Sequence, residues 1–517
     1  MMRIRPKNEI MNFERLNIQL LALLLTSPLL SAKQWTVDTQ EAWMANQSEI
    51  KNVELEESTA RLTADSGSFK SIVKSFPEKR QAAAITLTQV PTWLNWQPVE
   101  HLGPENLEDA PIALRVGEGD YWVFGRYGKL KKVAAEDVEL EGFDIPLKTT
   151  ASPNVFDAVG AQESSLGGYH AWQSKDMVNW VHHGPVSDEK AKWMTTAERV
   201  GDQTYLYYDF PNDQDPHLII DDNLIDGKMG EKMGMAFKDP SHGSDCAIIR
   251  SLDGAFHLIL ENWDPINASK HSWDSPLASH AISADGIKDF KLVADAVDYR
   301  TTPTGKKGKY KHPHWAKEDP ENYSKKEAST EGRPRKRFFT AEYEIHEPEQ
   351  EAYGDWAAIS IGGQYYLFGD YDPAGSHGEH METVWFTSDD INKPFEKCGT
   401  IGSGHPDPDI IFAEGRFYLF SQEDDFVSDG PWIDGVEVRV GVDTDNDQKV
   451  DQWTDWSIVK ETYREIDGFS KQVAKAPALL NLESLSEGYG FQYEIRLSDV
   501  AESDAKVSLD KVVLSFK

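Results

Sequence analysis

The segment AAISIGGQYYLFGDY, residues 357–371, indicates the fold because its pattern recurs along the chain. It contains a short apolar strand, a glycine turn and a second strand of alternating aromatic residues, which together predict a β-hairpin. Four other segments share this pattern: 111–125, 195–210, 246–262 and 409–422. The chain therefore repeats one kind of hairpin.

A second element recurs between the hairpins, with Ser and Asp ahead of an apolar strand. It occurs at 172–186 (WQSKDMVNWVHHGPV), 281–293 and 385–401. An inner hairpin followed by outer strands, repeated every 50 to 110 residues, is typical of a β-propeller. The five hairpins predict an all-β fold with a five-bladed β-propeller.

The two flanks contain alternating strands without the hairpin pattern. They predict an accessory β-sandwich built from the N- and C-terminal segments, with two independent extensions as the alternative. The expected organisation is a signal peptide at 1–32, sandwich strands at 33–98, a catalytic propeller at 99–430 and further sandwich strands at 431–517.

The first 32 residues combine a basic start, an apolar run over 16–30 and the small residues Ser31 and Ala32. This pattern is typical of a secretory signal peptide, so we expect a periplasmic or secreted protein. No later segment approaches 18 apolar residues, and no membrane partner is expected.

The formal net charge of −34 repels polyanions, which argues against nucleic acid as a partner. Residues 300–340 form a basic insertion with twelve Lys or Arg against five Asp or Glu. Such a patch could capture an anionic polysaccharide, or it could be a solvated loop. Cys246 and Cys398 are expected to be isolated, and no organic cofactor is predicted.

Residues that precede the inner strands of a propeller converge on its central funnel. At these positions the sequence has Asp109, Asp245, the pair His346 and Glu347, and Asp355 with His405 further on. The stretch 341–356 alone holds six carboxylates. Like charges and burial raise carboxyl pKa values, which lets one group stay protonated while another is ionised. Glycoside hydrolysis needs this combination of acid and base.

At this point the sequence resembles the five-bladed propeller glycoside hydrolases of families 32, 43 and 117. ENLEDAPIALRVGEGDYWVFG resembles their first blade, SKDMVNWVHHGP their recurrent outer strand, and GSGH their last blade. The adjacent His346 and Glu347 are most similar to family 117, the 3,6-anhydrogalactosidase type. The resemblance implies Asp109 as base, Asp245 as pKa modulator, and His346 or Glu347 as acid.

Other residues are candidates for substrate binding. His170 could line the pocket with Trp172 in apolar contact, or be a structural histidine bonded within the fold. Arg126 could pair with an anionic sugar group, or form a salt bridge between blades. Asp355 could tune the acid or bridge blades, and His405 precedes the last inner strand.

DTDNDQKVDQW, residues 443–453, contains a separate candidate for a metal site. Its carboxylates Asp443, Asp445, Asp447 and Asp451 have the spacing of calcium-loop positions one, three, five and nine. Gln448 replaces the usual Gly and Thr454 the usual Glu. The pattern predicts a structural Ca²⁺, with an acidic turn as the alternative.

Three functions compete at this level. The first is an exo-acting, inverting glycoside hydrolase on a marine algal polysaccharide, such as a sulfated galactan. The second is a propeller-type lyase that uses a His or Tyr base on a uronate-containing polysaccharide. The third is a non-catalytic carbohydrate-binding protein.

Overall fold

The computed structural model describes residues 34–517, apart from several segments. The excluded residues are 57, 92, 94, 101, 160, 162–167, 189–192, 211–214, 242, 263–275, 299–301, 313–338, 348–349, 375, 377–380, 404–405, 423, 432–434 and 499–506. The expected signal peptide and most of the basic insertion lie outside the described residues. Within the described part the chain is nearly all β-strand, as predicted, and its single α-helix is α2 (Gln40–Asn46).

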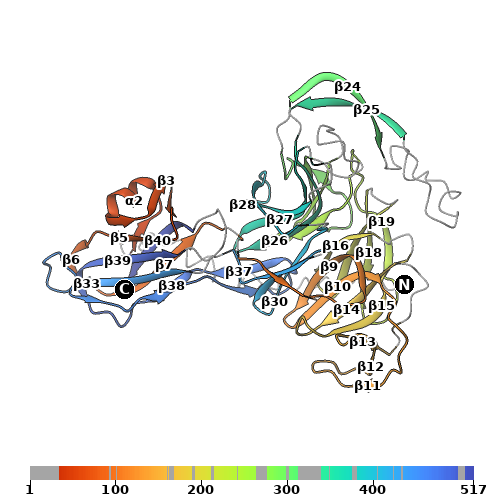
Figure 1. The fold of residues 1–517 in the computed structure, drawn as a ribbon, viewed down its shortest axis with the longest axis horizontal. Helices are drawn as coiled ribbons and strands as arrows, with labels where there is room; N and C mark the ends of the chain where they lie inside the picture. The colour runs from red at the N-terminus through yellow and green to blue at the C-terminus, as the bar shows by residue number, and fades with distance from the viewer. Residues whose placement is uncertain are drawn as a thin grey trace, which may run out of the picture. The chain divides into compact units, whose positions relative to one another are not determined.

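The chain forms two compact units (Figure 1). Unit 1 comprises residues 1–91, 433–461 and 477–517, and unit 2 comprises 92–432 and 462–476. Residues 462–476, which we expected in the C-terminal sandwich, therefore belong to the same unit as the repeated hairpins.

Unit 2 contains five mainly antiparallel sheets that are each built on one of the predicted hairpins. Sheet I consists of β9 (Leu107–Gly117), β10 (Asp120–Tyr127), β14 (Tyr169–Ser174), β15 (Trp180–Pro185), β13 (Val155–Ala158), β12 (Leu147–Thr149) and β11 (Asp137–Val138), with β13 parallel to β15. Sheet II consists of β16 (Met194–Val200), β17 (Gln203–Asp209), β18 (Pro216–Asp221) and β19 (Glu231–Met235). Sheet III consists of β20 (Ala247–Arg250), β21 (Phe256–Glu261), β22 (Ala278–Ser283) and β23 (Lys291–Leu292).

Sheets IV and V each recruit strands from distant parts of the chain. Sheet IV consists of β26 (Ala352–Ile361), β27 (Gln364–Asp372), β28 (Glu382–Ser388), β29 (Glu396–Ile401), β36 (Thr462–Glu465) and β37 (Gln472–Ala476). Sheet V consists of β30 (Asp409–Ala413), β31 (Arg416–Phe420), β32 (Asp425–Ser428) and β8 (Gln97–Val99). β37 pairs with β26 in parallel, and β8 adds the first strand of unit 2 to its last sheet.

The five sheets pack against one another in a ring. Separate clusters of buried apolar side chains join sheets I and II, II and III, III and IV, IV and V, and V and I. The innermost strands β9, β16, β20, β26 and β30 contact one another in the same cyclic order. Side chains on both faces of these strands are therefore largely buried, which explains the apolar runs within β9, β20, β26 and β30.

A separate two-stranded hairpin contains the acidic stretch that drew attention in the sequence. β24 (Thr302–His312) pairs with β25 (Phe339–Glu347), as Figure 1 shows. The register places Lys307 opposite Glu344 and Lys309 opposite Glu342.

Unit 1 contains two sheets in which N-terminal and C-terminal strands alternate (Figure 1). One sheet consists of β1 (Gln34–Val37), β3 (Val53–Glu56), β4 (Thr59–Leu62), β7 (Ala82–Gln89), β38 (Ala478–Asn481) and β40 (Ser508–Phe516). The other consists of β2 (Gln47–Lys51), β5 (Ser66–Ser71), β6 (Lys74–Arg80), β33 (Val436–Asp443), β34 (Gln452–Trp453), β35 (Ser457–Ile458) and β39 (Gly488–Ser498). Aromatic contacts join the two sheets, for example Trp35 with Tyr493 and Phe76 with Phe516.

None of the helices in the described residues has the length and apolar character that crossing a membrane requires.

Candidate functional site

Four aspartates occupy the same unusual backbone position in four different sheets. Asp109, Asp245, Asp355 and Asp407 have φ values of 72°, 43°, 48° and 32°. Each lies in or directly before the innermost strand of its sheet, and β-bulges interrupt the pairing of β9 and β26 at these points. Aspartate is among the few residues other than glycine that tolerate positive φ, and bulges often redirect side chains near active sites. The same backbone conformation therefore recurs at four carboxylates, each at or just before the start of an innermost strand.

A second set of polar residues follows the aromatic run of each hairpin. In chain order these residues are Arg126, Asp209, Glu261, Asp370 and Gln422. Members of this set contact the aspartates of the first set. For example, the backbone N–H of Asp407 donates to Asp370 Oδ1 at 2.8 Å. The Gln422 amide donates to Asp407 Oδ2. In the last hairpins, polar groups after the second strand therefore meet the aspartates at the start of the first strand.

Five carboxylates form a continuous group there. One oxygen each of Asp245, Glu261 and Asp355 lies within 4.8 Å of the others, and the same holds for Asp355, Asp370 and Asp407. Asp355 belongs to both sets and connects sheets III, IV and V. The Ser244 hydroxyl lies 2.8 Å from Asp245 Oδ2 and 3.0 Å from Glu261 Oε2. A hydroxyl has one hydrogen to donate, so contact with both carboxyls is favourable when one of them is protonated.

The surroundings of Asp355 strongly affect the pKa of its carboxyl. Burial raises its pKa well above the ordinary value, and the negative charges of Asp407, Asp245 and Asp370 raise it further. The side chain is half-buried, so solvent or a ligand can reach it. Asp355 can therefore hold a proton that it could give to a bound molecule.

Asp109 lies beside a cation. Its Oδ2 is 2.8 Å from Arg126 Nε, and the Arg126 guanidinium stacks over the Trp193 ring at 3.7 Å. An ionised carboxylate is the form that benefits from this ion pair. Asp109 thus lies in an ion pair with a cation, whereas Asp355 lies among like charges.

The buried phenol of Tyr169 is influenced by the charge of Asp109 and also by charges of the carboxylate group. Burial raises its pKa well above the ordinary value, and the charges of Asp109, Asp407 and Asp245 raise it while that of Arg126 lowers it. Tyr169 therefore lies within the electrostatic reach of carboxylates from sheets I, III and V. Its hydroxyl remains a neutral hydrogen-bond donor.

The predicted acid pair belongs to the two-stranded hairpin β24–β25 and not to the five sheets. His346 and Glu347 belong to β25, which pairs with β24 and with none of the five sheets in the described residues. The Glu347 side chain is exposed, and the side chain of His346 lies outside what the structure describes. Among the described residues, Glu347 is therefore not one of the carboxylates grouped around Asp355.

His170 and Trp172 are buried within sheet I. His170 Nδ1 lies 2.8 Å from His182 Nε2, and His182 Nδ1 lies 3.0 Å from the Asp157 carboxylate. The Trp172 indole donates to Asn106 Oδ1 at 3.1 Å. Burial and the neighbouring His182 lower the pKa of His170 to about 3. These contacts are those of the structural alternative, and His405 lies outside the described residues.

The predicted calcium loop lies in unit 1. One oxygen each of Asp443, Asp445 and Asp447 lies within 4.8 Å of the others. Asp451 instead accepts hydrogen bonds from the backbone N–H and hydroxyl of Thr444. Asp443 is fully buried and accepts from two backbone N–H groups, which leaves each of its oxygens a second lone pair. Three hard oxygen donors thus fit Ca²⁺, with Asp451 outside the set.

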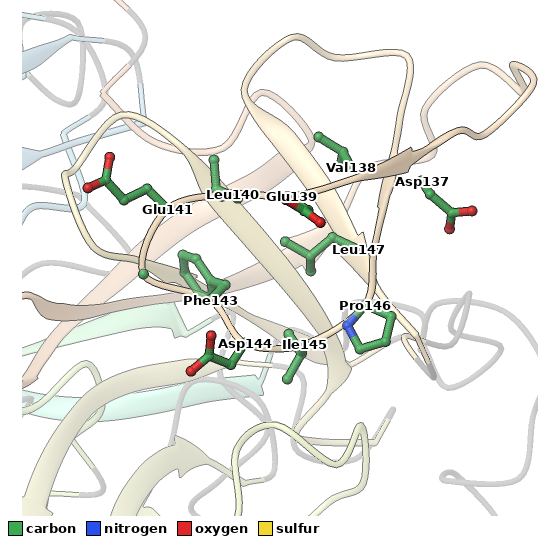
Figure 2. A pocket seen from close by; sticks show the side chains of 11 residues that line it. Asp137, Val138, Glu139, Leu140, Glu141, Phe143, Asp144, Ile145, Pro146 and Leu147 are labelled. Carbon is green, nitrogen blue, oxygen red and sulfur yellow. The ribbon is translucent and has the colours of Figure 1, made fainter.

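A groove of about 1020 Å³ is formed by residues 137–147 alone, between β11 and β12. Figure 2 shows Asp137, Glu141 and Asp144 pointing in different directions rather than toward one point. The groove therefore lacks the convergent polar groups that a small-ligand site needs.

Comparison with known proteins gives weak similarity. No protein-family model and no curated protein matches the chain. Among solved structures, a GH43_1 enzyme from Xanthomonas citri is 12% identical, with 75% of this chain and 94% of that chain covered and a TM-score of 0.34.

Two other structures are similar to the same degree. An arabinanase from Bacillus subtilis is 11% identical, with 63% and 96% covered and a TM-score of 0.35. An exo-β-1,3-galactanase from Phanerochaete chrysosporium, in complex with β-1,3-galactotriose, is 9% identical, with 83% and 100% covered and a TM-score of 0.34. Similarity at this level does not decide the activity of this chain.

Sequence reasoning missed Glu261, Asp370, Asp407 and Tyr169. A signal for the first two was present, because aligning the five aromatic runs places a polar residue directly after each of them. Asp407 lies two residues after His405, which the sequence suggests as a binding residue. Tyr169 had no signal, since it looks like any aromatic residue at the start of a strand.

Proposed function

We propose that this protein is a glycoside hydrolase whose site is the group of carboxylates in unit 2. The observation that carries the proposal is that Asp109, Asp245, Asp355 and Asp407 start the innermost strands of four sheets, and that burial and neighbouring charges raise the pKa of Asp355 among them. Acid–base hydrolysis of a glycosidic bond needs this pairing.

The scaffold we propose is a five-bladed β-propeller in unit 2 and a β-sandwich in unit 1. The cyclic packing of five sheets and the aromatic contacts between the two sheets of unit 1 support these assignments. In a propeller the starts of the innermost strands surround the axis, which accounts for the position of the carboxylates.

The roles follow from the local environments. Asp355 donates its proton to the leaving glycosidic oxygen as the bond to the anomeric carbon breaks. Asp109 accepts a proton from the water that attacks the opposite face of that carbon, and Arg126 holds this carboxylate in place. Asp245 adds negative charge that keeps Asp355 protonated. A single displacement by water inverts the anomeric centre.

The substrate we propose is an algal polysaccharide or its oligosaccharides, attacked from one end. Exposed Lys306 and Lys307 on β24 favour anionic polymers such as sulfated galactans. The five carboxylates of the site disfavour an anionic group on the sugar that contacts Asp355. We therefore place the charged groups of such a substrate away from the cleaved bond.

A lyase is the second candidate, because Tyr169 and Arg126 lie close enough to influence each other. A tyrosinate could remove a proton next to a uronate carboxylate that the arginine neutralises. Two features weigh against it. Burial and three carboxylates keep Tyr169 protonated, and the same carboxylates repel a uronate.

We further propose that the protein is exported, on the basis of residues 1–32, and that Asp443, Asp445 and Asp447 bind a structural Ca²⁺. When bound, the ion would neutralise the charge that these three carboxylates bring together.

The test is digestion of a panel of neutral, sulfated and uronate-containing polysaccharides by the parent protein and by Asp109→Asn and Asp355→Asn. Each substitution removes an acid or base and should lower kcat/KM by about 10²–10⁴-fold. Asp202→Asn, in the exposed turn before β17, is the matched control and should keep parental activity.

The products distinguish the candidates. New reducing ends without unsaturated sugars support hydrolysis, and NMR of the first-formed anomer reports inversion. Unsaturated uronates, detected by their ultraviolet absorbance, would replace the hydrolase by the lyase. Binding without turnover in the parent and both variants would leave a carbohydrate-binding protein.

A further inference from the structure

Sheet II differs from the other four sheets at the start of its innermost strand. In sheet III the N–H of Glu261 donates to the carbonyl oxygen of Ser244 at 3.2 Å, and Asp245 follows in the chain. In sheet II the Asp209 N–H makes the equivalent hydrogen bond to the Trp193 carbonyl oxygen at 2.9 Å. The residue that follows is a buried methionine. Sheet II thus has an indole and a thioether at the point where the other sheets have an aspartate.

The indole of Trp193 lies against the cation of the site. The guanidinium carbon of Arg126 is 3.7 Å from the centroid of the Trp193 ring. A guanidinium within about 6 Å of an aromatic centroid is attracted to the ring face, and tryptophan attracts it most strongly. Arg126 is the one cation in the second set of polar residues, whose other members are acidic residues and a glutamine. The contact therefore joins sheet II to the charged end of sheet I.

Arg126 makes an ion pair that does not fix its orientation. Its Nε lies 2.8 Å from Asp109 Oδ2, but Nε and Nη2 are both buried without a hydrogen bond to any described residue. An attraction of this kind depends on charge and distance, whereas a planar guanidinium is oriented by aligned hydrogen bonds or by stacking. Contact with the Trp193 ring is therefore what restricts the position of the guanidinium beside Asp109.

Both members of the ion pair need such support. The side chain of Arg126 is 31% exposed and that of Asp109 is 18% exposed. A partly exposed arginine has many rotamers available, and holding it in one of them costs conformational entropy. A ring that covers one face of the guanidinium reduces the number of these rotamers.

Trp193 is itself held on the side of sheet III. Asp209, which bonds to its carbonyl oxygen, is buried and accepts the Asp245 N–H through Oδ2 at 3.5 Å. The Trp193 backbone is therefore connected to one aspartate of the site, and its ring, through Arg126, to another.

We propose that Trp193 is a positioning residue that holds the Arg126 guanidinium, and through it the Asp109 carboxylate, in place. Its consequence for catalysis rests on the proposed hydrolase function, in which Asp109 is the base. A base has to lie within hydrogen-bond reach of the attacking water, and a displacement of about 1 Å can cost about 10²-fold in rate.

The experiment compares Trp193→Leu, which removes the ring, with Trp193→Phe, which keeps one. Trp193→Leu should lower kcat by about 10- to 100-fold with KM little changed, because the base acts in the chemical step. Trp193→Phe should keep most of kcat, since a phenyl ring also attracts a guanidinium. Equal losses of kcat in the two variants would overturn the proposal. A raised KM with parental kcat in Trp193→Leu would overturn it as well, because Trp193 would then bind substrate.

A double-mutant cycle tests whether Trp193 acts through Arg126. If it does, adding Trp193→Leu to Arg126→Met should change kcat by no more than about twofold. If the two losses multiply, Trp193 acts independently of Arg126 and the proposal is wrong.

Trp453→Leu in unit 1 is the matched control. The guanidinium carbon of Arg439 is 4.5 Å from the Trp453 ring centroid, so this variant also removes an indole from an arginine. It should keep parental kcat. A loss as large as that in Trp193→Leu would contradict a specific role for Trp193.

A measurement without substrate covers the case in which Trp193→Leu lowers stability. In ¹⁵N-labelled protein the Arg126 Nε–H signal is assigned by its absence in Arg126→Met. Loss of the indole should change its chemical shift and lower its heteronuclear NOE, in Trp193→Leu and to a smaller extent in Trp193→Phe, because the guanidinium becomes more mobile. A signal that superposes on that of the parent in both variants would refute the proposal even in an active enzyme. If the signal changes while the parent leaves every polysaccharide intact, Trp193 still positions Arg126 and the hydrolase assignment fails.

Discussion

At the scale of single residues, the decisive feature is the left-handed backbone of four aspartates. Asp109, Asp245, Asp355 and Asp407 each adopt a φ that most side chains avoid, at matching points of separate sheets. Strain of this kind persists where the surrounding structure requires it, and it is concentrated at functional sites. Asparagine tolerates the same backbone, which makes Asp→Asn substitutions suitable probes of charge.

Asp407→Asn should lower the pKa of Asp355, because it removes the largest like-charge contribution to that pKa. We expect the alkaline limb of the pH profile to move to lower pH by about one unit, since the acid would lose its proton earlier. The limb is measured from kcat/KM between pH 5 and 9. Asp202→Asn should leave it in place, and an unmoved limb in Asp407→Asn would remove Asp355 as the acid.

Asp295 allows a test of the same physics away from the site. Burial and the charges of Asp298 and Asp239 raise its pKa from 3.8 to about 6. Its proton therefore favours the folded state at low pH, and this contribution is lost as pH rises from about 4 through 6. Above pH 6, Asp295→Asn should unfold about 2–4 °C higher than the parent, whereas below pH 4 the two should coincide. Equal melting temperatures at every pH would contradict the raised pKa.

At the scale of elements, the hairpin β36–β37 shows how a late segment completes an earlier sheet. Arg115 holds it through two carbonyl oxygens and the Glu465 carboxylate. The Arg115 side chain is 3% exposed, and the hydrogen bonds that its two terminal nitrogens make within the described residues go to this hairpin and its turn.

Arg115→Met should therefore destabilise unit 2 by about 3–5 kcal/mol, because it leaves partly buried Glu465 without its partner. Arg464→Met is the matched control, since Arg464 is exposed on the same hairpin and should change stability by less than about 0.5 kcal/mol. Urea unfolding followed by tryptophan fluorescence measures both. Similar losses in the two variants would show that the hairpin contributes little to unit 2.

At the scale of the whole molecule, buried histidines make the fold sensitive to acid. Burial lowers the pKa of His170, His183 and His280 to about 3 and that of His257 to about 4. A histidine whose folded pKa is lowered stabilises the fold above its unfolded value of about 6.5, and this stability is lost as pH falls below it.

At pH 5 each of these histidines should cost about 2 kcal/mol of stability relative to pH 7. Thermal unfolding measured between pH 7 and 5 should therefore show a steep fall in melting temperature. His257→Gln should flatten this dependence, because glutamine does not titrate. An unchanged slope would mean that His257 is protonated in the folded protein.

The loop proposed to bind calcium lies in unit 1, so the stability of the chain reports on calcium binding. Ca²⁺ at 100 times its Kd should raise the stability of the parent by about 2.7 kcal/mol, and chelator should reverse the change. Asp445→Asn should abolish the response, whereas exposed Asp455→Asn should keep it. A parent that melts identically with Ca²⁺ and with chelator would leave the loop an acidic turn.

The sequence alone determined the local structure. The five aromatic hairpins, the alternating strands of the flanks and the nearly all-β character follow from period-2 patterns and turn residues, which act over a few positions. Asp109, Asp245 and Asp355 could be found because each directly precedes or begins such an apolar strand.

Only the tertiary structure decided which charges meet. Glu347 is in a carboxylate-rich stretch but is exposed on a separate hairpin, whereas Glu261 joins Asp355 from a strand that is far away in sequence. Arg115 meets Glu465 only because β37 pairs with β26, and β36 with β37. Burial and the distances between charges set protonation, and both are properties of packing that no local pattern contains.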